Sequence, residues 1–181
     1  MSRTQKEDGI AVAGETLHAL TFFMDQEEYA VELLKVREIM EYREPTVVPM
    51  TPAAVRGVIN VRGKVVPIVD LAIKFGLADL TISKRTCIII VEVDVDGADT
   101  SMGLVVDAVN EVREFAGDEI EDAPSFGTKV RVDYLQGMGR TKDKFALILD
   151  IDKVLSDMEI EAVKKLHDEK RGENQEEGEA D

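Results

Sequence analysis

The chain has 181 residues, and its 37 acidic and 22 basic residues give a formal net charge of −15 at pH 7. Such an acidic surplus argues against general binding to nucleic acid or to anionic membranes, because both require a basic surface. The sequence has no apolar run of the roughly 18 residues that a membrane-spanning helix needs, no signal-peptide core near its start, and only one cysteine. We therefore expect a cytoplasmic protein without disulfides or direct membrane insertion.

The first part of the chain predicts a disordered segment followed by short strands. Residues 1–16 are polar or small, as is typical of disordered termini. Apolar residues over 17–24 and 29–33 flank the polar turn Asp25-Gln26-Glu27, which predicts a β-hairpin. The stretch Val36-Arg37-Glu38-Ile39 alternates apolar and polar residues, so we expect a strand whose polar side chains face away from the core.

The stretch TPAAVRGVINVRGKVVPIVDLAIKFG, which begins at Thr51, is rich in turn and cap signals. Thr51-Pro52 suits the start of a short helical turn, which Gly57 is expected to end. The pair Arg62-Gly63 lies between two β-rich runs and predicts a tight hairpin, because glycine accepts a positive φ. A short helix should follow, with these signals: the cap Asp70, the body 71–75 and the terminal Gly76.

This β-rich unit is written twice. At an offset of 80 residues the first copy falls on the second at several positions, including Gly57 on Gly137, Ile68 on Ile148 and Asp70 on Asp150. At an offset of 73 residues Val31 falls on Leu104, Glu38 on Glu111 and Ile39 on Val112. An internal repeat of many short strands predicts a mainly β fold with two similar small barrels.

The second half repeats the strand pattern and ends in polar sequence. Strands are expected over 87–95, 102–106 and 109–115, with a loop over 117–129 and a hairpin over 134–149. Apolar residues from Ile151 to Leu166 recur at helical spacing, which predicts an amphipathic helix over 151–167 that packs on the barrels. Residues 168–181 carry seven acidic and two basic residues and predict a disordered, solvated tail. The β-rich domain is thus expected over 17–155, as two intertwined subdomains with halves of about 17–85 and 86–155.

Residue types that carry catalysis or bind metal are not arranged for either. His18, His167 and Cys87 have no metal-ligand spacing. The acidic residues around Gly97 resemble the start of a calcium loop, but the closing glutamate is missing, so we interpret them as a polar hairpin tip. We therefore expect no enzyme activity, no cofactor and no metal.

Two features are instead typical of a binding surface. Arg62 occupies a tight hairpin tip, where Asn or Asp would meet a structural need, and an ion pair with Glu38 is geometrically plausible. Phe126 lies in a Pro/Gly loop and is either an anchor on its own barrel or an exposed contact residue. Solvation alone is the alternative explanation for Arg62.

The chain closely resembles the CheW family, the coupling proteins of bacterial chemotaxis. The resemblance covers roughly 17–155 and is carried in order by EYAVELLKVREI, TPAAVRGVINVRGKVVPIVDLAIKFG, MGLVVDAVNEV, DAPSF and YLQGMG…FALILDIDKVL. It implies two five-stranded, SH3-like β-barrel subdomains and a non-enzymatic adaptor. The implied partners are the cytoplasmic tips of chemoreceptors, the regulatory domain of the histidine kinase CheA, and other CheW-like proteins in rings, so that the protein would join membrane-associated receptor arrays.

The resemblance also implies two sets of contact residues. The receptor-facing groove corresponds to Val36, Glu38, Gly57, Val58, Asn60 and Arg62. The kinase-facing surface corresponds to Phe126 and Glu121, although some relatives carry a basic residue where this chain has Glu121. The main alternative is a CheW-like scaffold of a non-flagellar chemosensory pathway. The other rival interpretations are a CheV-like adaptor, a detached kinase regulatory module and a small enzyme with an unrecognised site.

Overall fold

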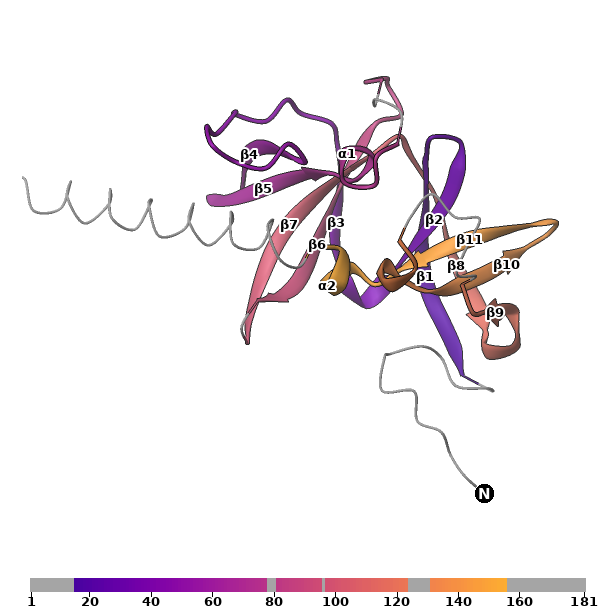
Figure 1. The fold of residues 1–181 in the computed structure, drawn as a ribbon. Coiled ribbons are helices and arrows are strands. Elements are labelled where there is room, and N and C mark those ends of the chain that lie inside the picture. Colours follow the sequence, from indigo (N-terminus) through magenta and orange to yellow (C-terminus); the bar gives the residue numbers. More distant parts are fainter. Residues whose placement is uncertain (1–14, 78–80, 96, 124–130, 156–181) are drawn as a thin grey trace, which may run out of the picture.

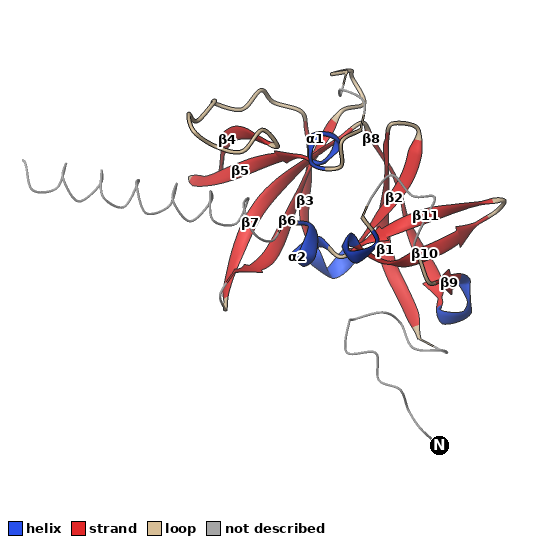
Figure 2. Ribbon diagram, viewed as in Figure 1, coloured by secondary structure: helices blue, strands red, loops and turns tan. Residues whose placement is uncertain are grey.

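The computed structural model describes residues 15–77, 81–95, 97–123 and 131–155. Within these ranges the chain forms two β-sheets that lie side by side, with two short α-helices between them (Figure 1). The predicted mainly β fold with two small barrels is confirmed, and helix is confined to short turns between strands (Figure 2). The strands are β1 Thr16–Met24, β2 Glu27–Glu32, β3 Val36–Glu41, β4 Val55–Val61, β5 Lys64–Asp70, β6 Cys87–Val95, β7 Ala98–Val106, β8 Ala108–Ala116, β9 Ile120–Glu121, β10 Leu135–Thr141 and β11 Lys144–Leu149. The helices are α1 Leu71–Lys74 and α2 Ile151–Val154, with 3-10 turns η1 Leu33–Lys35, η2 Gly117–Glu119 and η3 Val132–Tyr134.

Each sheet takes strands from both halves of the chain. The six-stranded sheet has the order β8-β1-β2-β11-β10-β9, and the five-stranded sheet has the order β3-β6-β7-β5-β4. Each contains one parallel pair, β2 with β11 and β5 with β7. In these pairs Val31 faces Leu149 and Leu104 faces Val69. The two offsets of the sequence repeat therefore meet in three dimensions, because each equivalent pair of residues occupies the same place in its own sheet.

Local turn chemistry forms the hairpins and helix ends as predicted. Arg62 and Gly63 both have positive φ, 53° and 83°, as a two-residue turn between twisted strands requires. Asp70 caps α1 by accepting hydrogen bonds from the backbone N–H groups of Ala72 and Ile73, at 3.0 and 3.3 Å. Gly76 has a φ of 68° and ends the helix in the left-handed region.

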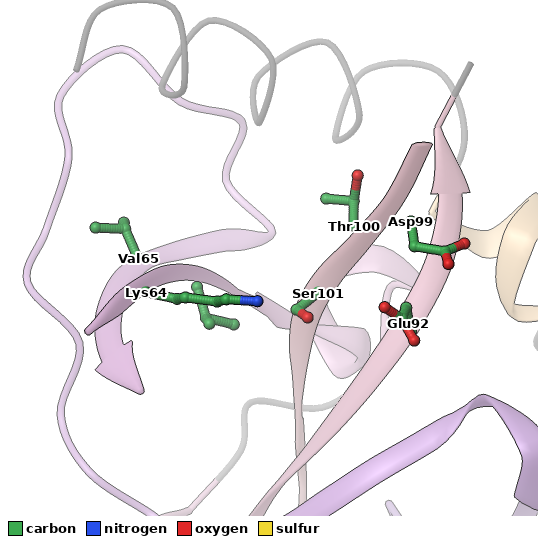
Figure 3. A pocket seen from close by; sticks show the side chains of 7 residues that line it. Lys64, Val65, Glu92, Asp99, Thr100 and Ser101 are labelled. Atoms are coloured by element: carbon green, nitrogen blue, oxygen red, sulfur yellow. The ribbon is translucent and has the colours of Figure 1, made fainter. Parts of the chain in front are cut away.

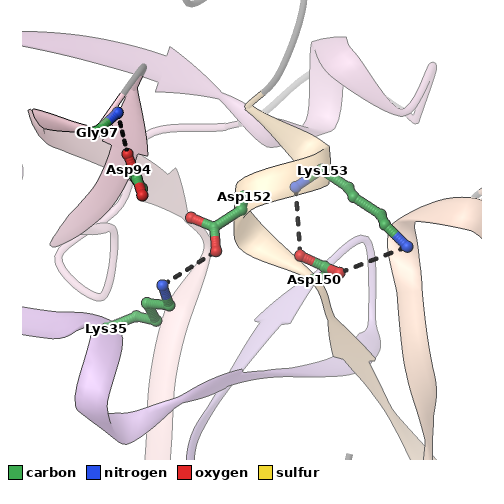
Figure 4. A network of polar contacts seen from close by, with 6 residues as sticks. All are labelled: Lys35, Asp94, Gly97, Asp150, Asp152 and Lys153. Carbon is green, nitrogen blue, oxygen red and sulfur yellow. Dashed lines mark hydrogen bonds and ion pairs between the residues drawn. The ribbon is translucent and has the colours of Figure 1, made fainter. Parts of the chain in front are cut away.

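The repeat-equivalent helix α2 is held in a similar way. Asp150 accepts a hydrogen bond from the backbone N–H of Lys153 at 3.3 Å, and Lys35 of η1 forms an ion pair with Asp152 at 3.0 Å (Figure 4). The hydrogen bond to Asp152 raises the pKa of Lys35. The same figure shows the β6–β7 hairpin tip, where the Asp94 side chain accepts from the Gly97 N–H at 2.8 Å. The predicted polar hairpin tip is confirmed, and the predicted helix beyond Leu155 lies outside the described residues.

The predicted helical turn after Thr51 is wrong. One hydrogen bond, from the Val55 N–H to the Pro52 carbonyl, makes a single turn, and β4 then begins at Val55. Gly57 lies inside β4 at a bulge rather than at a helix end. The reason is long-range pairing, because Thr46 and Val58 exchange two backbone hydrogen bonds of 2.9 Å and draw this segment into the sheet.

Apolar side chains form three clusters. One fills each barrel, around Phe115 in the six-stranded sheet and around Ile68 in the five-stranded sheet. The third and largest lies between the sheets, where Val31 and Phe22 of one meet Leu104 and Val91 of the other. The two barrels are therefore joined by a shared apolar core, and burial of that core holds their relative orientation.

Four aromatic rings extend from this shared core toward the surface. Phe22 stacks on Tyr29 at 6.0 Å, Tyr29 on Phe75 at 6.2 Å, and Phe75 meets Tyr134 at 6.0 Å between ring centroids. Phe22 and Tyr29 belong to the six-stranded sheet, whereas Phe75 follows α1 at the end of the five-stranded sheet. The rings therefore contribute to the contact between the barrels.

Tyr29 is expected to ionise last among the three tyrosines of the chain. Burial, and then the negative charges of Glu27 and Asp25, raise its pKa from 10.0 to about 12. Between these pKa values the unfolded chain loses a proton that the folded chain keeps, so the free energy of unfolding should fall by at most about 1.4 kcal/mol per pH unit. Absorbance of tyrosinate against pH, with Y42F and Y134F variants to assign each step, measures this. Ionisation of all three tyrosines near pH 10 without unfolding would contradict it.

Candidate partner-binding site

The five-stranded sheet is bridged at a seam between its two edge strands, β3 and β4. A guanidinium nitrogen of Arg62 lies 3.4 Å from a carboxylate oxygen of Glu38, so the predicted ion pair is present. Close by in the chain, Arg43 donates a hydrogen bond of 3.1 Å to the backbone carbonyl of Asn60. We call Glu38, Arg43, Asn60 and Arg62 the seam residues. Together they place two guanidinium groups against one edge of the barrel.

The hairpin tip presents Arg62 to solvent in a backbone conformation that does not favour arginine. The side chain is 82% exposed, and its φ of 53° lies in the left-handed region, which costs a residue with a Cβ about 1–2 kcal/mol. The Asn60 side chain stabilises the turn by accepting a hydrogen bond from the Gly63 N–H at 2.9 Å. An exposed ion pair contributes only about 0–1 kcal/mol, so fold stability does not account for an arginine at this tip.

Glu38 faces the seam because β3 contains a bulge. The register of β3 against β6 shifts between Val36 and Glu38. As a result the Glu38 side chain is only 28% exposed, whereas Ile39 is 44% exposed. The prediction that the polar side chains of this strand all face away from the core is therefore wrong for Glu38.

The structure brings together some of the predicted receptor-facing residues and separates others. Glu38, Asn60 and Arg62 meet at the seam. Gly57 and Val58 lie further along β4, where Thr46 pairs with Val58. Val36 is half-buried and packs against the apolar core between the sheets. Sequence reasoning missed Arg43 and Thr46, because they lie in an irregular segment without periodicity and contact β4 only through the fold.

The predicted kinase-facing residues are only partly described. Glu121 lies in the two-residue strand β9 and forms an ion pair with Arg140 of the neighbouring strand β10. A basic group is thus adjacent to the position where some relatives carry one. Phe126 lies outside the described residues, so its two interpretations both remain predictions.

A pocket of about 360 Å³ opens where β5 and β7 diverge beyond their parallel pairing (Figure 3). The Lys64 ammonium points toward Ser101 from across the pocket, and Glu92 and Asp99 line the β6–β7 side. Glu92 is engaged by Arg37 in an ion pair. In the part of the chain that the structure describes, no group of three or more His, Cys, Asp or Glu side chains could hold a metal ion. The mixed charges indicate a surface that makes polar contacts.

Neither α1 nor α2, nor any other helix among the described residues, is long and apolar enough to cross a bilayer.

Comparison with known proteins gives consistent matches over both sheets. The family described as the CheW-like domain matches residues 18–159. The chemotaxis protein CheW of Klebsiella aerogenes is 34% identical over 154 residues, which cover 84% of this chain and 90% of the relative. The CheW of Bacillus subtilis is 31% identical over 136 residues, covering 75% and 85%. The crystal structure of the scaffolding protein TtCheW from Thermoanaerobacter tengcongensis is similar with a TM-score of 0.71 and 31% identity, covering 80% of this chain and 91% of that one.

Proposed function

This chain belongs to the CheW family of chemotaxis proteins, and we propose that it is a non-enzymatic adaptor that couples chemoreceptor tips to the regulatory domain of the kinase CheA. The observation that carries the proposal is the seam, where Glu38 holds an exposed Arg62 on a strained hairpin tip. A residue kept in an unfavourable backbone conformation without a gain in stability is typical of a functional position.

The receptor-facing surface is proposed to run from the seam along β4. Val58 is half-exposed on that strand and supplies an apolar contact, while Asn60 and Arg62 supply polar contacts at its end. A helical receptor tip can place apolar side chains along such a strand and meet the charged groups with its polar residues. The Glu38 carboxylate then orients the Arg62 guanidinium before binding, which lowers the entropy cost of ordering it in the complex.

The kinase-facing surface is proposed to lie on the other barrel, around β9 and β10. Glu121 and Arg140 form an ion pair there, with both side chains about half-exposed. A surface of paired charges fixes orientation and partner choice more than it adds affinity. Because receptor and kinase contacts lie on different barrels, both partners can bind at once, and the adaptor would be recruited from the cytoplasm to membrane-associated arrays. The adaptor changes kinase activity only by binding one kinase conformation more tightly than another.

Arg62→Ala is expected to weaken binding of a receptor-tip fragment at least tenfold, a loss of about 1.4 kcal/mol. The reason is that the substitution removes the exposed guanidinium while also relieving no buried contact. Binding of the isolated CheA regulatory domain should change less than twofold, and the thermal unfolding midpoint should be retained. Calorimetric titration of the purified protein against each partner measures all three quantities.

The matched control is Arg85→Ala, which removes an exposed arginine from a segment outside both surfaces. It should leave both affinities unchanged. Glu38→Ala should give a smaller loss than R62A, and the double variant E38A/R62A should lose no more than R62A alone, since Glu38 acts through Arg62. Unchanged receptor binding by R62A would contradict the proposed receptor surface, and binding to neither partner by the unaltered protein would contradict the adaptor function.

A further inference from the structure

A second pocket, of about 440 Å³, lies between the end of α1 and η3. Aromatic and basic side chains dominate its lining, which consists of Ile73, Lys74, Phe75, Gly76, Arg131 and Tyr134. It takes no part in the seam or in the surface around Glu121. We call it the Tyr134 pocket.

Two cations flank the tyrosine ring of this pocket. The Lys74 ammonium lies 5.6 Å from the ring centroid of Tyr134, and the Arg131 guanidinium lies 5.1 Å from it. Both distances are within the range of cation–π attraction, which orients the two basic groups around one ring. Phe75 closes the other side of the ring, at 6.0 Å between centroids.

The rim of the pocket already binds one carboxylate. Asp133 accepts two hydrogen bonds from Arg131, at 3.1 and 2.7 Å, in a bidentate arrangement. This contact uses two of the five N–H donors that a guanidinium carries, so three donors are left for other acceptors. The hydrogen bonds and charge of Asp133 raise the pKa of Arg131. The pocket therefore combines a permanently charged guanidinium with a second cation at short range.

The chain leaves the described part of the structure beside this pocket. α2 contacts η3, and the Asp150 N–H donates a hydrogen bond of 2.8 Å to the Tyr134 carbonyl. Leu155, directly after α2, is fully buried, which anchors the chain at this point. Any segment that follows Leu155 therefore starts close to Lys74 and Arg131.

The sequence that follows Leu155 supplies a carboxylate-rich segment. Residues 168–181 contain seven acidic and two basic residues. If residues 156–167 were helical they would span about 18 Å, and residues 168–181 in extended form could cover more than about 40 Å on the way back. The acidic segment can therefore reach the Tyr134 pocket within one molecule, and tethering gives it a high effective concentration there.

We propose that the Tyr134 pocket is a carboxylate-binding site and that its occupant is the chain's own acidic segment, residues 168–181. Lys74 and Arg131 bind glutamate or aspartate side chains of the segment, and the face of Tyr134 packs against their methylene groups. The contact is electrostatic, so salt weakens it. It does not rest on the proposed adaptor function, since neither receptor nor kinase takes part.

A spin label on the acidic segment of the full chain tests this proposal. In a Cys87→Ser background, a label on Gln175→Cys is expected to broaden the backbone NMR signals of Lys74, Gly76 and Tyr134 at low salt. Serine suits position 87 because the half-buried Cys87 thiol donates to the Arg85 carbonyl at 3.2 Å, a bond that a hydroxyl can keep. The broadening should be lost near 0.5 M salt, where charges more than about 5 Å apart are screened.

Two charge-reversed variants of equal charge change separate this site from general attraction to basic groups. K74E/R131E should abolish the broadening, whereas K142E/K144E, on the β10–β11 hairpin, should keep it. Broadening that survives K74E/R131E, that appears first on another element, or that is absent at low salt would overturn the proposal. If K74E/R131E does not fold, the single variants K74Q and R131Q and the salt dependence of the unaltered chain give the same decision.

Discussion

Gly57→Ala is expected to lower the free energy of unfolding by about 3–5 kcal/mol and to give the largest loss of any glycine-to-alanine change in the five-stranded sheet. A Cβ at this position would lie 2.1 Å from the Thr46 carbonyl oxygen, a backbone atom that cannot turn aside. The φ of 144° is also one that L-residues rarely adopt. Alanine must therefore break the Thr46–Val58 pairing. Urea unfolding at equilibrium measures the loss.

Gly63→Ala is the control that separates steric clash from backbone strain. Gly63 also has a positive φ, 83°, but nothing lies within 4 Å of the place where its Cβ would be. Its substitution should cost only about 1 kcal/mol. Equal losses for G57A and G63A would show that backbone conformation alone explains both, and would contradict the role given to the contact with Thr46.

Asp70→Ala is expected to lower the free energy of unfolding by about 3–4 kcal/mol. The side chain is 0% exposed and accepts a hydrogen bond of 2.7 Å from Arg56 besides capping α1. Burial alone would lower the pKa of Arg56, but the hydrogen bond and charge of Asp70, with a contribution from Tyr42, raise it. Removing the carboxylate therefore leaves a partly buried guanidinium and two backbone N–H groups without their acceptor. Urea unfolding of D70A against the unaltered chain measures the effect.

The internal repeat supplies the matched control, Asp150→Ala. Asp150 caps α2 as Asp70 caps α1, but it is 16% exposed and its cation, Lys153, lies 3.8 Å away. Losing this cap should cost about 1 kcal/mol, the ordinary value for a helix N-cap. A loss in D70A no larger than that in D150A would mean that Arg56 adds nothing to the cap. A loss in D70A that the double variant R56A/D70A does not exceed would instead confirm that the two side chains act as one unit.

Features set by neighbouring residues could be predicted from the sequence. The hairpin at Arg62-Gly63 and the cap at Asp70 depend on side chains and φ preferences within a few residues, and the repeat revealed that each occurs in a barrel-forming unit. The motif order indicated the family, which the comparisons show. The Glu38–Arg62 ion pair could be expected because both residues were placed on neighbouring parts of one small barrel, and the structure contains it.

Other features were decided by tertiary structure alone. Local signals after Thr51 favour a helical turn, yet pairing of Thr46 with Val58 places Gly57 in a strand instead. The bulge in β3 turns Glu38 to the seam, and the seam gains Arg43 from an irregular segment. The exchange of strands between the two halves likewise depends on parallel pairs, β2 with β11 and β5 with β7, that join distant segments. Composition and periodicity specify which face of a strand is apolar, but its partner and register depend on the packing of the whole sheet, and the binding surface is built from that register.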